Sequence, residues 1–332
     1  MIDDTLIAPL SDAFGQVQQW LFEAVVQPLV FEAGMGNLLE DAYTATGWLL
    51  VGLIQMLVLL AVIGPLQRWR PVERVRDTAG VWVDLLYTVI HRLGLFRVAM
   101  FFSVEPLLDE VFGQVSVWGV NGVQLDGLLA PLWPGVSDTA WASFLVYLLV
   151  FDLLDYWIHR GQHHANRWWA LHAVHHSQRH MTMWSDNRNH LLDDLLRDVL
   201  IAFTARAIGV PPGQFVALVA VTQLVESFSH ANLRLSFGWL GERLLVSPRF
   251  HRQHHAIGIG HESEGPGTLG GCNFAVLFPV WDMLFGTARF DGGFEPTGIR
   301  DQLPDQGGRD YGRGFWAQQW LGLRRLVGRD AV

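Results

Sequence analysis

The sequence predicts an all-α, polytopic membrane protein: a helical bundle with a cytoplasmic, histidine-rich metal-binding cap. Three observations predict this fold class. Half of the 332 residues are hydrophobic and only 17% are charged. One apolar run is long enough to cross a bilayer. Thirteen of the fourteen histidines lie between residues 159 and 261.

The first predicted membrane span covers residues 47–66, whose one polar side chain apart from its tryptophan is Gln55. Twenty helical residues at about 1.5 Å each cross a hydrocarbon layer of about 30 Å. Acidic residues precede this run, and four arginines follow it within residues 67–76. Because positively charged loops stay on the cytoplasmic side, we expect residues 67–76 to be cytoplasmic.

A second span is predicted over 79–103, although Asp84, His91, Arg92 and Arg97 interrupt it. Charged side chains are costly inside a bilayer, so these residues must face protein or extend to the interface. Residues 105–138 lack lysine and arginine, which predicts an outer loop. A third span over 139–158 then returns the chain to the inside.

The remaining segments complete a three-part organisation. Two apolar runs between 195 and 229 flank Pro211-Pro212-Gly213, which predicts a helical hairpin. Residues 315–327 are expected to form an amphipathic helix on the membrane surface. No cleavable signal peptide is recognised near the start. We therefore expect an N-terminal membrane region (1–138), a catalytic domain (139–290) and a cytoplasmic tail (291–332).

Composition excludes several classes of protein and site. The single cysteine, Cys272, cannot form an intrachain disulfide or a four-cysteine zinc or iron–sulfur site. Any bound metal must therefore have nitrogen and oxygen ligands. A net charge of -9 argues against nucleic-acid binding.

The histidines fall into three short clusters with helical spacing. The first pairs His159 with His163, and the others follow an HxxHH pattern at 172–176 and 251–255. Residues three or four apart share one face of a helix, so each cluster can hold a metal ion. The predicted topology puts all three clusters on the cytoplasmic side, together with His230.

These clusters supply too many imidazoles for one zinc ion, which takes about four ligands, so two metals are expected. Imidazole suits iron, copper, zinc and nickel, and the spacing alone does not choose between them. Nearby carboxylates could orient or supplement the ligands, namely Asp152, Asp155 and Glu226. Five other histidines are expected not to be ligands: His91, His180 and His261, which lack such partners, and His164 and His190, as orienting or surface groups.

The motifs resemble those of the membrane fatty acid hydroxylase / sterol desaturase superfamily, whose signature is HxxxH, HxxHH and HxxHH. The resemblance includes the DLLDYWIHRGQH, WALHAVHHS and PRFHRQHH segments at 152–163, 169–177 and 248–255. Asn273-Phe274 and the WDMLFGT segment at 281–287 are similar to the family's closing motif, and His230 to its intermediate histidine. The resemblance covers about 139–290.

The resemblance implies a non-haem di-iron centre that uses O2 and two electrons to hydroxylate or desaturate a fatty acyl, sterol or isoprenoid lipid. It implies that Asn273 lies near the ligands. No motif for a redox cofactor is present, so a separate donor is expected: a ferredoxin or small haem protein with its reductase. We expect an inner-membrane protein with its active site on the cytoplasmic face. The implied ligands are His159, His163, His172, His175, His176, His230, His251, His254 and His255.

Two other classes of function stay open at this stage. One is a histidine-rich membrane protein that transports metal, or that binds metal or haem for electron transfer. The other is a di-zinc membrane hydrolase, although no histidine cluster contains a glutamate suited to act as general base. The glycine-rich segment 256–272 is expected to be either a mobile lid or an insertion. Substrate identity and regiochemistry are left open.

Overall fold

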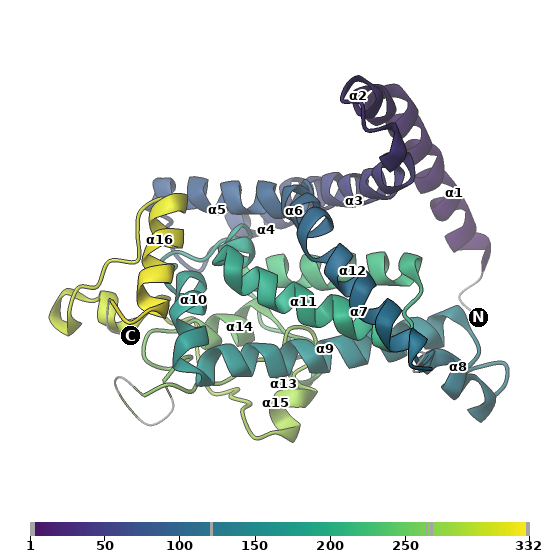
Figure 1. Ribbon diagram of the computed structural model, residues 1–332. Helices are drawn as coiled ribbons and strands as arrows, with labels where there is room; N and C mark the ends of the chain where they lie inside the picture. Colours follow the sequence, from purple (N-terminus) through teal and green to yellow (C-terminus); the bar gives the residue numbers. More distant parts are fainter. Residues whose placement is uncertain (1–3, 120–121, 263–264, 266–267, 330–332) are drawn as a thin grey trace.

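The computed structural model describes residues 4–119, 122–262, 265 and 268–329. Over these residues the chain is helical without a β-strand, apart from one isolated bridge between Ala256 and Thr297. The predicted all-α class is confirmed (Figure 1). The α-helices are α1 (Asp4–Leu21), α2 (Gln27–Glu32), α3 (Leu39–Val58), α4 (Gly64–Trp69), α5 (Thr78–Arg92), α6 (Leu95–Ser103), α7 (Glu105–Val117), α8 (Leu125–Leu129), α9 (Ala140–His164), α10 (Asn166–His176), α11 (Leu191–Ala207), α12 (Pro212–His230), α13 (Gly238–Leu244), α14 (Pro248–His254), α15 (Val280–Leu284) and α16 (Phe315–Leu326).

Shorter helical turns connect several of these helices. Two are π-helical, Phe22–Val26 and Leu59–Ile63. The others are 3-10 turns at Gly36–Leu38, Ala130–Leu132, Ser185–Asn187, Arg300–Gln302 and Pro304–Gln306.

In the part of the chain that the structure describes, two helical stretches are long and apolar enough to cross a membrane: Gly36–Trp69, which contains α3 and α4, and α9. They include the first and third predicted spans. The second prediction, one helix over 79–103, is wrong in detail, because α5 and α6 meet at a bend of 49°. Gly94 adopts φ +82° at the break, a conformation that glycine takes without strain. Together α5 and α6 could form one broken span.

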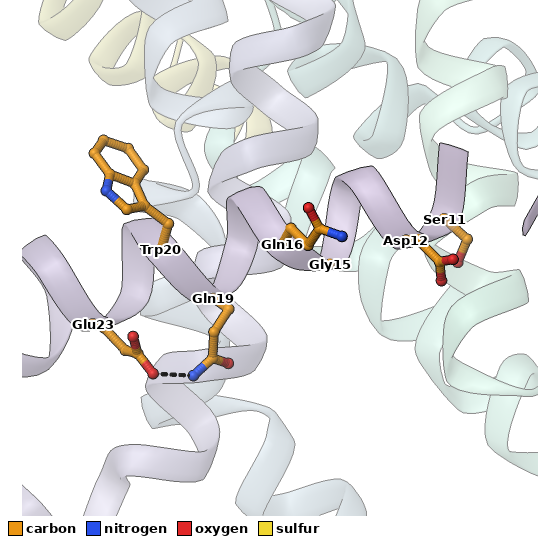
Figure 2. Close-up of a pocket in the computed structure, with 7 residues that line it drawn as sticks. All are labelled: Ser11, Asp12, Gly15, Gln16, Gln19, Trp20 and Glu23. Atoms are coloured by element: carbon orange, nitrogen blue, oxygen red, sulfur yellow. Dashed lines mark hydrogen bonds between the residues drawn. The ribbon is translucent and has the colours of Figure 1, made fainter. Parts of the chain in front are cut away.

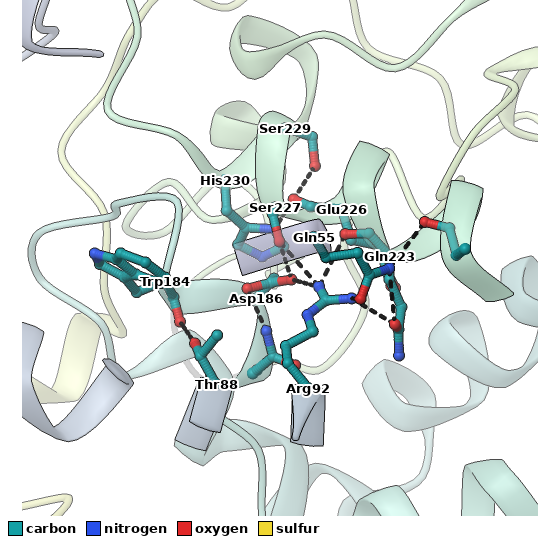
Figure 3. Close-up of polar contacts among 12 residues, drawn as sticks. Gln55, Thr88, Arg92, Trp184, Asp186, Gln223, Glu226, Ser227, Ser229 and His230 are labelled. Carbon is teal, nitrogen blue, oxygen red and sulfur yellow. Dashed lines mark hydrogen bonds and ion pairs between the residues drawn. The ribbon is translucent and has the colours of Figure 1, made fainter. Parts of the chain in front are cut away.

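The charged residues of α5 and α6 face protein, as predicted. Asp84 and Arg92 are buried and form ion pairs with the 184–188 segment of the cap. Figure 3 shows the network around Arg92. The Arg97 guanidinium lies 3.5 Å from the centre of the Trp48 ring. The ion pairs of Asp84 and Arg92 join the N-terminal membrane region to the histidine-rich domain.

Residues 105–138 are not simply a loop, because they contain α7 and α8. The start of α7 is fixed by Arg206 at the end of α11, which contacts Glu105 at 2.5 Å and Asp109 at 2.8 Å. The predicted hairpin is confirmed: α11 and α12 are joined by residues 208–211. The α12 helix packs against both α3 and α9.

The two ends of the chain behave differently. At the N-terminal end, α1 and α2 project from the body of the protein (Figure 1). Figure 2 shows polar side chains of α1 and of the π-helical turn after it that line a shallow hollow, namely Asp12, Gln16, Gln19 and Glu23. The Gln19 amide donates to the Glu23 carboxylate.

The C-terminal tail forms the predicted helix at α16, but one face of this helix is fixed to the protein. It packs against α10 and α5. Tyr87 of α5 bonds to Gln318 and Gln319, at 3.0 and 2.9 Å. Trp316 and Trp320 on the other face are exposed. The C-terminal tail therefore packs onto the histidine-rich domain.

Candidate metal centre

Four helices bring the clustered histidines together. The first pair lies in the last turns of α9, the second cluster at the end of α10, His230 at the last position of α12, and the third cluster on α14 and its C-cap. Ser247 fixes the start of α14 by accepting a hydrogen bond from the Phe250 amide at 3.1 Å. Eight histidines form two buried groups whose members could each hold one metal ion.

Group A consists of His159, His163, His176 and His254, and its ligand nitrogens lie within 4.8 Å of one another. The Nε2 atom of His176 lies 3.0 Å from that of His163 and 3.2 Å from that of His254. The Nε2 atom of His159 is buried without a hydrogen-bond partner among the described residues. Group A thus combines all three histidine clusters.

Group B consists of His175, His230, His251 and His255, again within 4.8 Å. The Nε2 atom of His230 lies 3.2 Å from that of His175 and 3.0 Å from that of His251. The Nε2 atoms of His251 and His255 are 3.2 Å apart. Group B draws on the second and third clusters and on α12.

The two histidine doublets explain how both groups form side by side. His175 belongs to group B and His176 to group A, while His254 belongs to group A and His255 to group B. Consecutive residues on a helix point about 100° apart, so a doublet can serve two neighbouring ions. The rings of His176 and His255 stack with centres 4.3 Å apart.

The nitrogen geometry fits metal binding. Two nitrogens that each lie about 2.1 Å from one ion are about 3.0–3.2 Å apart when they subtend roughly 90–100° at the ion. The observed Nε2 separations of 3.0–3.2 Å match this range. These pairs of imidazoles are therefore close enough to share one ion.

Backbone carbonyls fix the tautomer of three candidate ligands. The Nδ1 atom of His159 donates to the Phe274 carbonyl at 2.8 Å, and that of His254 to the Cys272 carbonyl at 2.7 Å. His230 donates in the same way to the carbonyl one turn earlier in α12, at 2.7 Å. Because a carbonyl only accepts, each Nδ1 carries the proton and each Nε2 keeps its lone pair for a metal.

Asn273 shapes the turn that supplies two of these carbonyls. It has φ 60°, in the left-handed region that asparagine tolerates better than most residues. Its side-chain amide donates to the carbonyls of Phe250 and Arg289 at 3.1 and 3.0 Å. Its side-chain oxygen accepts from the Arg289 amide at 2.7 Å. The carbonyls on either side of Asn273 are those bonded to group A.

Asp282 of the closing motif braces the same turn. Its carboxylate accepts from the amides of Phe274 and Ala275, at 2.9 and 2.8 Å, and from the Thr287 hydroxyl at 2.6 Å. The carboxylate therefore acts on group A through the backbone that orients His159.

The carboxylates predicted to orient the histidines do so less directly. Asp152 accepts three hydrogen bonds from the 277–281 segment and contacts no histidine. Asp155 pairs with Arg197 at 2.9 Å. The expectation that either accepts from a ligating imidazole is wrong, because a charged arginine is the stronger partner for Asp155 and the His159 N–H is directed to a carbonyl.

Glu226 also acts differently from expectation. Its backbone carbonyl, rather than its carboxylate, accepts from His230. The carboxylate lies 3.5 Å from Arg197 and belongs to neither group.

His172, the ninth expected ligand, lies beside the groups without joining either. Its Nδ1 contacts the Asp193 carboxylate at 3.0 Å, and its buried Nε2 has no hydrogen-bond partner among the described residues. Its ring centre is 5.3 Å from that of His159. Asp193 also accepts from Gln162 at 2.8 Å and Trp168 at 2.6 Å. Sequence reasoning missed Asp193, whose only local signal is a carboxylate in the first turn of a helix.

The histidines expected to lie outside the ligand set are outside both groups. His190 caps α11, and its ring contacts the Gln319 carbonyl at 2.9 Å. His164 is exposed, His180 contacts Glu73, and His91 contacts Asp194. His261 is buried beside group A, where its ring stacks on Trp169.

Burial favours the neutral form of the histidines in groups A and B. Removal from water disfavours the charged imidazolium and lowers the pKa of His254 to about 3. The same cause holds the pKa values of His175, His176, His251 and His255 well below their usual range. A neutral imidazole is the form that binds a metal ion.

Comparison with known proteins shows what the region around this centre is similar to. Residues 144–287 match the family model described as Fatty acid hydroxylase. The chain is 23% identical over 230 residues to an ornithine lipid hydroxylase from Rhizobium tropici, a match that covers 69% of this chain and 64% of that protein. It is 31% identical over 150 residues to an alkylglycerol monooxygenase from Danio rerio, covering 45% of this chain and 31% of that protein.

A third relative is a Delta(7)-sterol 5(6)-desaturase from Gibberella zeae, 26% identical over 193 residues, with 57% of this chain and 54% of that protein covered. The chain thus spans from about a third to just under two thirds of the length of these curated relatives. No solved structure matches the chain. Residues 144–287, which contain all three histidine clusters, are therefore similar to the fatty acid hydroxylase family.

Proposed function

We propose that the chain is a membrane-bound lipid hydroxylase that uses O2, two electrons and two irons, one in group A and one in group B. The observation that carries the proposal is the pair of adjacent, buried four-imidazole groups within the matched family domain. The named relatives act on lipids as hydroxylase, monooxygenase or desaturase, which supports a lipid as substrate.

Bound iron would supply the oxidative chemistry, in which a carbon–hydrogen bond, O2, two electrons and two protons give an alcohol and one water. The contribution of the chain is positional. The carbonyls at 272, 274 and 226 hold the Nδ1 protons, so that three Nε2 lone pairs point inward. Burial of all eight histidines keeps bulk water away from the centre.

The location of the candidate ligands suits a lipid substrate. His159 and His163 lie at the end of α9, a helix long and apolar enough to cross the membrane. An acyl or isoprenoid chain beside this helix could bring one carbon close to the centre, which is a positioning effect.

We propose that this centre faces the cytoplasm of an inner membrane. The basic segment after the first span contacts the cap directly. The Arg70 carbonyl accepts from the Arg234 amide at 2.7 Å, and Glu73 contacts Arg252 of α14 at 2.5 Å. Because basic segments stay on the cytoplasmic side, a cap attached to this one would lie there too. The proposed donor is a cytoplasmic ferredoxin or small haem protein with its reductase.

The first test is metal content followed by product analysis. Detergent-purified full-length chain, expressed with added iron, should contain about two irons per chain, as expected for a centre in which each ion has its own ligand group. Incubated with membrane lipid extracts, O2 and a chemical reductant, it should give a product one oxygen heavier. A product lacking two hydrogens would indicate desaturation instead. The proposal would be contradicted if the purified chain contained stoichiometric zinc and the protein loaded with iron formed no oxygen-dependent product.

His176→Ala is the matched variant for this test. It removes one group A ligand and should lose the group A iron and all product formation while the protein stays in the membrane fraction. Product formation at the rate of the unchanged chain would contradict the assignment of His176.

A further inference from the structure

A cavity lies beside one flank of the buried centre. This cavity has a volume of about 430 Å³ and lies where α10, the segment after α14 and the C-terminal tail meet. Its lining includes Trp169, His261, Arg300, Asp301 and Arg309. The candidate ligands themselves are all buried, so a large partner cannot touch them directly.

Trp169 separates this cavity from group A by one aromatic ring. On one side it stacks on His261, with ring centres 5.6 Å apart and planes at 16°. On the other side its ring centre lies 5.1 Å from that of His163 and 5.3 Å from that of His176. The same side chain therefore touches the cavity and two candidate ligands of group A.

His261 is an unusual residue to line such a cavity. It is 3% exposed, and neither ring nitrogen has a hydrogen-bond partner among the described residues. Buried polar atoms without partners are costly and uncommon, and they call for an explanation. Its ring centre is also 6.0 Å from that of His176. His261 belongs to neither metal group, so metal binding does not account for it.

The mouth of the cavity carries exchangeable charges. Arg300 pairs with Glu262 at 2.9 Å, and Arg309 with Asp301 at 3.0 Å. The two arginine side chains are 33% and 29% exposed. In the Arg309–Asp301 pair both side chains are partly exposed, and such pairs contribute little to stability, so these two residues can form new pairs with charges on a docking protein.

We propose that a one-electron donor protein, of the iron–sulfur or haem class, docks at this cavity and that Trp169 is the path from it to group A. The inference rests on the proposed function and adds the entry point for electrons. Each hydroxylation needs two electrons, so two reduced donor molecules dock in turn and each leaves oxidised by one electron. The electrons, two protons and O2 end in the alcohol and one water.

The path can be tested by injecting electrons at the cavity. Gln306 lines the cavity and is exposed, so a ruthenium photosensitiser can be attached to Gln306→Cys. The one native cysteine, Cys272, is buried and its thiol pKa is raised to about 12 by burial, so it will not compete for the label. A laser flash then delivers one electron, and the loss of ferric absorption gives the rate.

We expect Trp169→Leu to slow this reduction at least several-fold while iron per chain stays unchanged, with Trp169→Phe between the two. The control is Trp157→Leu. Trp157 is exposed and packs on Phe285, away from the cavity, and its variant should reduce at the original rate. Equal rates in Trp169→Leu and the unchanged chain would overturn the path.

Docking has a readout that needs no iron. A photoreactive group on Gln306→Cys in the metal-free protein should cross-link a plant-type ferredoxin more than the same group on Gln114→Cys of α7. Equal cross-linking from both positions would overturn the docking site. Reduced methyl viologen separates the two levels of the proposal. If methyl viologen reduces the iron but Trp169→Leu does not slow reduction from the cavity, only the path is contradicted. If no iron can be reduced at all, both the proposed function and the path are contradicted.

Discussion

Groups A and B each consist of four histidines, but different hydrogen bonds hold these histidines in place. In group A, His159 and His254 donate to carbonyls of the turn at Asn273, which lies far from both in sequence. In group B, His230 is the one member with such a partner among the described residues, and that carbonyl belongs to its own helix. A hydrogen bond to the ring nitrogen that does not face the metal orients a histidine ligand and strengthens metal binding. The comparison therefore indicates that group A is the more rigid and tighter site.

The surroundings of the two groups also differ. Group A lies beside Trp169 and the cavity. Group B lies at the end of α12, which contributes Gln223 and Ser227 to the buried network in Figure 3. In this network Asp186 contacts Arg92 at 2.8 Å and accepts from Ser227 at 2.7 Å. Group A thus borders the proposed donor side, and group B borders the buried network that joins α12 to α5.

The largest expected effect comes from removing one ligand of each group in turn. His254→Ala should empty group A and His251→Ala should empty group B, so that iron falls from about two to about one per chain in either variant. Hydroxylation should be undetectable in both, because the proposed reaction needs both ions. Elemental analysis beside product assay checks this. If either variant lost all iron, the groups would not be independent sites.

The next largest effect concerns the network beside group B. Arg92→Met leaves the Asp186 carboxylate buried without its cation, which should cost about 3–5 kcal/mol of unfolding free energy. The double variant Arg92→Met with Asp186→Asn should recover part of this loss. Denaturation in detergent micelles measures both. Unfolding of the single variant at the same denaturant concentration as the unchanged chain would show that the pair does not hold the domains together.

A smaller, selective effect is expected at Asn273. Asn273→Ala removes the hydrogen bonds that hold the turn and should weaken metal binding in group A by about 10- to 100-fold, while group B is unchanged. Asn273→Gly keeps the left-handed conformation without the side chain and separates backbone strain from lost bonding. The substitutions are made in the His251→Ala variant, whose remaining iron is in group A. Iron content is compared between this variant alone and the same variant with Asn273→Ala or Asn273→Gly. Equal retention in all three would contradict the role of this turn.

The smallest effect is a difference in the order of metal loss. On dialysis of the unchanged chain against a mild chelator, iron should leave in two phases, first from group B and then from group A. His251→Ala should show only the slow phase and His254→Ala only the fast one. The reverse assignment would refute the inference that carbonyl support makes group A tighter.

Local spacing explains what the sequence predicted well. The histidine clusters lie on helices, where three- and four-residue spacing fixes a shared face regardless of the rest of the fold. The first and third spans were predicted from the length of their apolar runs, and the hairpin from Pro211-Pro212-Gly213, which are also local signals. The break at Gly94 was missed, because an isolated glycine is also tolerated inside helices.

Contacts between distant segments explain what the sequence did not reveal. The turn at Asn273 reaches group A only after the chain has folded back onto α9 and α14. Asp193 meets His172 through packing of α11 against α9 and α10. Asp155 is one turn from His159, yet a distant arginine takes its carboxylate. No spacing rule indicates which of several nearby groups a buried side chain contacts.

The central claim is that each four-histidine group holds one iron. Diffraction from crystals of the iron-loaded chain, recorded on both sides of the iron absorption edge, tests it most directly. The account predicts two anomalous peaks, one among the Nε2 atoms of group A and one among those of group B, each lost in the matching His254→Ala or His251→Ala crystal. A single peak shared by both groups, or no peak at the iron edge, would contradict it.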